Sequence, residues 1–308
     1  MNTNAVPESA VDSREVAPAT IQTTRLLYWS VRRELWENRS IYVAPLAVAA
    51  LFLVGFTLSM FRQADKIAAA LALNAVPQQK LIQEPYTFAA LLLMFTTFIV
   101  TAFYCLDALH GERRDRSILF WKSLPVSDLT TVLSKAIIPV VVMPLLTFAV
   151  TVATQWIMLL LSSVVLMARG LSVATLWTHL SLFPMSVMLF NHLLFIHGLW
   201  YAPIYCWLLL VSGWSRRAAF LWAGLPLLAI GVFEKLVFNS SHFAAMLKYR
   251  LGGDSQGDPF TGGRISMDPL KMFNPVEFVT SPGLWIGLMV AAVFLAAAVR
   301  LRRNRQPN

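Results

Sequence analysis

The sequence predicts an all-α integral membrane protein with six transmembrane helices, an amino-terminal interfacial helix and a short cytoplasmic helix between spans two and three. Its composition is the first reason: the 308 residues are 57% hydrophobic and 13% charged, whereas a soluble domain has about 25% charged residues. The second reason is that the apolar residues gather in long runs. Each run is near the roughly 20 residues that an α-helix needs to cross a bilayer.

Residues 1–40 precede the first run and are more polar. Residues 1–20 lack an apolar segment and are predicted to form a disordered cytoplasmic tail. Within 21–40, the stretch Thr24–Glu37 has apolar residues on one helical face and arginines on the other, with Trp29 and Trp36 among them. Trp and Arg favour the headgroup region, so we predict a helix on the cytoplasmic leaflet, in contact with membrane lipid. The alternative is a cytoplasmic extension of the first span.

The six runs make up the remaining domain, residues 41–308. Their approximate bounds are 41–61, 86–106, 136–161, 186–211, 218–238 and 282–301. The third run stays apolar to about Ala168, which is too long for one upright helix. We therefore expect it to tilt, to kink near Pro139 or Pro144, or to extend beyond the membrane. The extracellular connection 239–281 contains several glycines and prolines and is expected to be largely loop.

Lysine and arginine are distributed unevenly between the two sides of these spans. Most of the 25 lie before the first span, in the connections after spans two and four, and in the carboxyl tail. With six spans these four regions share one side, and the cytoplasmic side is the one enriched in positive residues. Both termini are therefore predicted to be cytoplasmic, in a multi-pass plasma membrane protein, or an inner membrane protein if the chain is bacterial. This orientation explains the net charge of +9 without a nucleic-acid partner.

Known catalytic and nucleotide-binding motifs are missing from the sequence. It contains no Gly-x-x-x-x-Gly-Lys-Ser/Thr phosphate loop, no His-Glu-x-x-His, no Gly-x-Ser-x-Gly and no Cys-x-x-Cys. Cys105 and Cys206 lie in apolar runs, which indicates small buried hydrophobic residues. We therefore expect no catalytic, cofactor-binding or metal-binding residue on this chain.

Several polar residues lie inside predicted spans, where burial of a polar side chain is costly. Four of them are candidates for a substrate path: Gln155, Asn191, His192 and His197. Hydrogen bonding between helices is the other interpretation. The two histidines are five residues apart, or about 140° on an ideal α-helix, so we expect them to be poor partners for one metal.

A polar island interrupts the apolar runs between spans two and three. It consists of Glu112, Arg113, Arg114, Asp115 and Arg116. A solvated loop would explain it, but its charges alternate in sign, and the residues after it are apolar enough to pack. These residues are Ser117, Ile118, Leu119, Phe120, Trp121, Lys122, Leu124 and Pro125. Pro125 stops a helix and Ser127 or Asp128 can cap the next one. The pattern predicts a short amphipathic helix with the aromatic and basic side chains that protein interfaces use.

The stretch Glu112–Ser127 resembles a segment of ATP-binding cassette (ABC) transporter permeases of the second exporter class, the ABC-2 type. In that family an Arg-rich stretch leads into a short apolar helix, closed by a Leu-Pro-Val-Ser-like turn, which docks into a cleft of the ATPase. The resemblance would make Ser117–Ser127 the coupling helix and Thr24–Glu37 the elbow helix, with Glu112–Arg116 at the membrane edge. The six-span layout with both termini inside also matches the family.

This resemblance implies a transport function. The chain would be a permease subunit that forms the translocation path for export and pairs with a second copy, as a homodimer. ATP and Mg²⁺ would bind a separate ABC ATPase subunit, which drives transport through the coupling helix. The residues alone leave two alternatives open. One is a membrane-embedded enzyme that uses His192 or His197, and the other is a membrane scaffold that transports nothing.

Overall fold

The computed structural model describes residues 23–62, 75–115, 126–170, 172–252 and 275–304. The described residues are helical almost throughout and contain no strand, in agreement with the predicted all-α class. Six helical stretches among them are long and apolar enough to cross a membrane: Ser40–Met60, Ile82–Arg114, Asp128–Ala168, Leu176–Trp200, Ala219–Phe238 and Pro282–Asn304. The chain is thus a helical protein with the composition of a multi-pass membrane protein.

In chain order, the described helices are α1 (Thr23–Glu37), α2 (Ser40–Arg62), α4 (Ala75–Asp107), α5 (His110–Arg114), α7 (Asp128–Ile137), η1 (Ile138–Val142), α8 (Met143–Ala168), α9 (Ala174–His179), α10 (Leu182–His192), η2 (Leu193–Trp200), α11 (Ala202–Trp214), α12 (Ala219–Phe238), α13 (His242–Gly252), α14 (Pro275–Thr280) and α15 (Pro282–Asn304).

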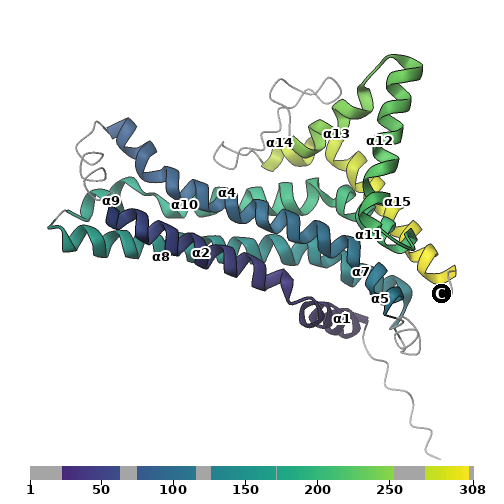
Figure 1. The fold of residues 1–308 in the computed structure, drawn as a ribbon, viewed down its shortest axis with the longest axis horizontal. Coiled ribbons are helices and arrows are strands. Elements are labelled where there is room, and N and C mark those ends of the chain that lie inside the picture. Colours follow the sequence, from purple (N-terminus) through teal and green to yellow (C-terminus); the bar gives the residue numbers. More distant parts are fainter. Residues whose placement is uncertain (1–22, 63–74, 116–125, 171, 253–274, 305–308) are drawn as a thin grey trace, which may run out of the picture.

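A long bundle organises these helices around α4. One half of the bundle contains α2, α8 and α10, which run beside α4 along the long axis (Figure 1). In the other half, α4 packs against α11, and α11 packs along α15. The helix α12 stands away from the bundle, and only Ala223 on it is buried. Cys105 and Cys206 are both buried, as predicted.

Two π-helical segments, η1 and η2, interrupt the long helices where they cross. Pro139 lies in η1 and Pro144 follows it, and because proline has no N–H, a wider turn accommodates both rings without a break. At the crossing, a side chain on Gly198 would put its Cβ 2.8 Å from the carbonyl oxygen of Val140. The distortion expected near the two prolines is therefore a π-helical segment within one continuous helix from Asp128 to Ala168.

The fourth predicted span, 186–211, differs from the structure. The apolar stretch Leu176–Trp200 ends at a turn at Tyr201, and the shorter apolar helix α11 follows. The backbone N–H of Tyr201 donates to the carbonyl of Ile196 at 3.1 Å, a π-type bond, and Pro203 lies in the first turn of the next helix. A run of apolar residues does not reveal such a turn, because its composition stays apolar on both sides.

Candidate functional site: a buried ion cluster

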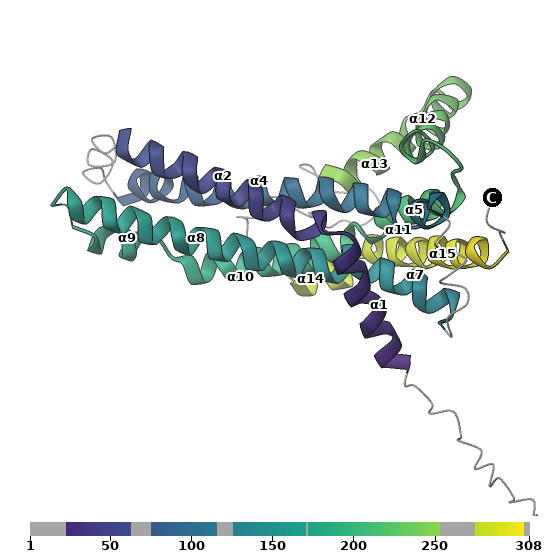
Figure 2. The same cartoon turned by 60° about the horizontal axis from the view of Figure 1, so that its bottom comes forward.

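Six charged side chains meet where α1, α5, α7 and α15 come together, and we call them the ion cluster. Its members are Arg33, Glu34, Glu112, Asp128, Lys135 and Arg302. Three are acidic and three are basic, so their formal charges cancel. Because unpaired charges are very costly to bury, this balance is what allows the cluster to lie inside the protein. Figure 2 shows α1 reaching this end of the bundle beside α7.

Lys135 lies at the centre of the ion cluster. Its Nζ is 2.8 Å from Oε1 of Glu34 and 3.1 Å from Oε1 of Glu112. The side chains of Lys135 and Glu34 are 3% and 0% exposed. The other carboxylate oxygen of Glu34 accepts a hydrogen bond from the hydroxyl of Tyr104 at 3.1 Å, and Arg33 adds an ion pair of 2.8 Å to Glu34. Lys135 thus joins α1 and α5 to α7.

Arg302, near the end of α15, holds the other side of the cluster. Its Nη1 binds Oε2 of Glu112, and its Nε donates to Oδ1 of Asp128 at 3.0 Å. Glu112 comes shortly before the segment 117–125 and Asp128 comes shortly after it. One arginine therefore ties both flanks of that segment to α15.

Two members of the ion cluster, Asp128 and Lys135, lie on the same face of α7. Ser127 is the N-cap, with φ −68° and ψ 149°, and its Oγ accepts the backbone N–H of Thr130 at 3.1 Å. This confirms the helix start predicted at Ser127 or Asp128. Asp128 and Lys135 are seven residues apart, which is nearly two helical turns. Both side chains therefore face the ion cluster.

The polar island is divided by the structure. Glu112 is buried in the ion cluster, whereas Arg114 and Asp115 form an exposed ion pair of 3.1 Å. Arg113 donates to the backbone carbonyls of Ser212 and Ser215 at the end of α11. The described residues of the island thus lie in three places: in the ion cluster, at the exposed surface and against the end of α11. Arg116 lies outside the described residues.

The predicted coupling helix also lies outside the described residues. It comprises Ser117, Ile118, Leu119, Phe120, Trp121, Lys122, Leu124 and Pro125. Its flanks are described on both sides, and they are the parts that the ion cluster fixes.

The four residues predicted to line a substrate path do not form one group in the structure. Gln155 donates to the backbone carbonyl of Tyr86 at 3.2 Å, which is a contact between helices. Asn191 is half-buried, and His192 and His197 are buried. The two imidazole centroids are 5.8 Å apart. The expectation of 140° between them is wrong, because His197 lies in a π-helix, whose hydrogen bonds span five residues instead of four, so that each turn holds more residues than the 3.6 of an α-helix.

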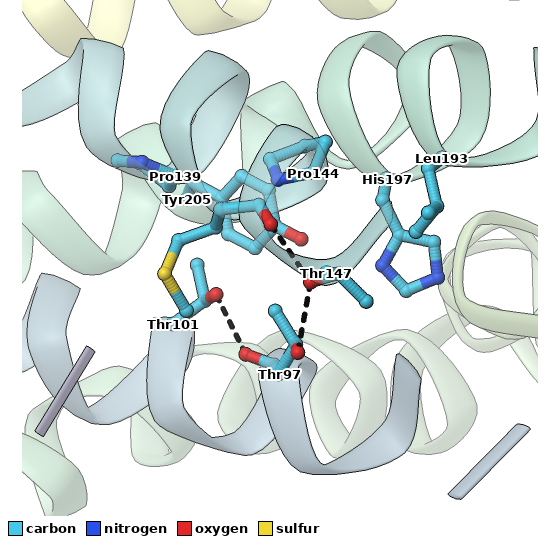
Figure 3. A pocket seen from close by; sticks show the side chains of 9 residues that line it. Thr97, Thr101, Pro139, Pro144, Thr147, Leu193, His197 and Tyr205 are labelled. Atoms are coloured by element: carbon cyan, nitrogen blue, oxygen red, sulfur yellow. Dashed lines mark hydrogen bonds between the residues drawn. The ribbon is translucent and has the colours of Figure 1, made fainter. Parts of the chain in front are cut away.

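His197 faces a small pocket beside the crossing of η1 and η2 (Figure 3). The hydroxyl of Thr147 donates to the carbonyl of Met143 at 2.7 Å and lies 2.9 Å from the hydroxyl of Thr97, with which it shares a hydrogen bond that links α8 to α4. The space totals about 180 Å³ but is too narrow to hold a water molecule. It is lined by Thr97, Thr101, Pro139, Met143, Pro144, Thr147, Leu193, His197 and Tyr205.

The sequence did not point to Glu34, Lys135 or Arg302 as a group. In the sequence, Glu34 follows two arginines and Arg302 lies among the arginines of the carboxyl tail, so neither stands out, and their partners lie up to 190 residues away along the chain. Within the described ranges, no three His, Cys, Asp or Glu side chains are grouped so that they could hold a metal ion. Comparisons with protein-family models, with curated proteins and with solved structures found no match to this chain.

Proposed function

We propose that this chain is the membrane-spanning subunit of an ATP-driven exporter, powered by a separate ATPase that docks on residues 117–125. The proposal rests on the two ion pairs that Arg302 forms with Glu112 and Asp128, the residues that flank that segment. A force applied to the segment would reach α15 through Arg302. It would reach α1 through Lys135 and Glu34, which bond at 2.8 Å.

The mechanism follows from this arrangement of contacts. ATP and Mg²⁺ bind the partner subunits, and closure of those subunits moves the docked segments as rigid bodies. The ion cluster carries the motion to the spans, and two permease copies rock about a path between them. Phe120 and Trp121 dock the ATPase. The proposal also includes export as the direction of transport, a homodimer of the permease, and a cytoplasmic position for residues 117–125.

To test this, the chain is reconstituted in vesicles with an ATPase that carries a phosphate loop, which is sought first among the products of the neighbouring reading frames. In Trp121→Ala, docking weakens, so that the ATPase binds less tightly and cargo no longer stimulates ATP hydrolysis. Arg302→Met should instead leave the ATPase bound and lower the stimulation. An exposed arginine outside the segment, Arg217, gives the control Arg217→Gln, which keeps both properties. Wild-type assembly and stimulation in Trp121→Ala would contradict the docking role.

A membrane-embedded enzyme is the second candidate, because the imidazole centroids of His192 and His197 are only 5.8 Å apart. That function predicts loss of activity on single histidine substitution, without any ATPase partner. Against it, the pocket beside His197 would not hold the water that a hydrolase needs. Activity of the purified chain alone, lost in His197→Phe, would favour the enzyme over the exporter.

A further inference from the structure

The outer face of α1 carries exposed arginine and aromatic side chains. Glu34 is fully buried in the ion cluster, and Arg32, two residues earlier, lies about 200° around the helix from it. Arg25 precedes Arg32 by seven residues and so lies on nearly the same side. On this face Trp29 is 56% exposed and Trp36 is 63% exposed. The ion cluster thus fixes which way this aromatic and basic face points.

Arg32 is held between the two indoles. Its Cζ lies 5.1 Å from the ring centroid of Trp29 and 4.6 Å from that of Trp36, both within cation–π range. No described acidic side chain forms an ion pair with Arg32, whereas its neighbour Arg33 is tied into the ion cluster. A planar guanidinium stacked in this way keeps its N–H donors at the edge, where they suit a phosphate.

The position of α1 relative to the first span sets the depth of this face. Only Asn38 and Arg39 separate α1 from α2, which is apolar enough to cross the membrane. The face therefore lies near the headgroups, where tryptophan is enriched. Arg39 is exposed in this short link and adds a third positive charge. Figure 2 shows the amino-terminal part of α1 projecting from the bundle, and the side chains of Trp29 and Trp36 are exposed among the described residues.

We propose that this face of α1 is a binding site for anionic phospholipid, with Arg32 as the ligand of the headgroup phosphate and Trp29 and Trp36 seated among the headgroups. The charge and the depth of the face both favour a lipid over a soluble anion or a protein segment. The site depends only on α1 lying at a membrane, so it stands independently of the proposed transport function.

The test measures lipid binding to the full-length protein. The chain is purified in a neutral detergent, phosphatidylglycerol or phosphatidylcholine is added, and native mass spectrometry counts the lipids retained. We expect phosphatidylglycerol to bind more tightly than phosphatidylcholine. In Arg32→Gln its affinity falls about fivefold, as expected for one cation near an anionic surface. Trp29→Leu combined with Trp36→Leu lowers the affinity without changing the charge, and Arg217→Gln, which removes an exposed arginine elsewhere, leaves it unchanged.

Two further measurements decide the source of the phosphate and the integrity of the fold. Glycerol 3-phosphate, the soluble headgroup chemistry, should not displace the bound lipid at matched concentration. If it does, the site is a general anion site and the proposal is overturned. Arg32 lies outside the ion cluster, so the thermal midpoint of Arg32→Gln should match that of the wild type. An unchanged affinity for phosphatidylglycerol in this folded variant also overturns the proposal.

Discussion

At the residue scale, Lys135 is the side chain on which the ion cluster most depends. It contacts both Glu34 and Glu112, and removing it would leave two buried carboxylates with less positive charge around them. Breaking a buried pair by removing one partner costs about 3–5 kcal/mol. We therefore expect Lys135→Met to lower the stability of the detergent-solubilised protein by about that amount, measured by thermal unfolding with tryptophan fluorescence.

The matched control is Arg114→Gln, because Arg114 is exposed and pairs only at the surface. Surface pairs contribute about 0–1 kcal/mol, so this variant should unfold close to the wild type. Adding Glu34→Gln to Lys135→Met removes one of the stranded charges and should recover part of the loss. Strictly additive losses in the double variant would mean that the two side chains do not interact.

Gly198 is the second residue at which we expect a substitution to lower stability. Its Cβ, if present, would lie 2.8 Å from the backbone oxygen of Val140, and a backbone atom cannot move away as a flexible side chain can. Overpacking of this kind costs about 1–3 kcal/mol. Gly198→Ala should therefore unfold earlier in the same assay. Gly55→Ala, at a helical glycine with nothing within 4 Å, should not; equal shifts in both would refute the close approach.

At the scale of the element, the N-cap of α7 positions both Asp128 and Lys135. The side chain of Ser127 accepts the N–H of Thr130, and loss of such a cap costs about 1 kcal/mol. We expect Ser127→Ala to lower stability by that amount, whereas Ser127→Asp, which can also accept the bond, should retain it. Urea or thermal unfolding of the two variants makes the comparison, and identical stabilities would argue against the cap.

The elements also mark the limit of what the sequence predicts. The apolar runs predict the number of candidate spans and the approximate position of each except the fourth, which ends at Trp200 rather than near residue 211. The Pro125, Ser127 and Asp128 pattern predicts the start of α7. Both are local properties of the chain. The π-helices at Pro139 and His197 cannot be predicted in this way, since the apolar composition does not change where the helical period widens. The ion cluster was not predicted either, because its members are brought together only by the packing of four helices.

At the scale of the whole molecule, the distribution of charge predicts the orientation. The connection before α12 contains Arg216 and Arg217, both exposed, and belongs to the regions that hold most of the lysines and arginines. The connection after α12 is one of those predicted to lie on the other, less basic side. If six helices cross the membrane, the carboxyl end of α15 shares the side of Arg217, and Ser241, beyond α12, lies on the opposite side.

Cysteine labelling of intact cells tests this orientation. Single cysteines at Ser241, Arg217 and Asn304, all exposed in the structure, are treated with a membrane-impermeant maleimide before and after permeabilisation. Background labelling should be low, because Cys105 and Cys206 are buried. We expect Ser241→Cys to react in intact cells, and Arg217→Cys and Asn304→Cys to react only once the membrane is opened. If α12 lay along the surface, the two positions that flank it would react alike. That outcome would remove a crossing, and with an odd number of spans the two termini would lie on opposite sides.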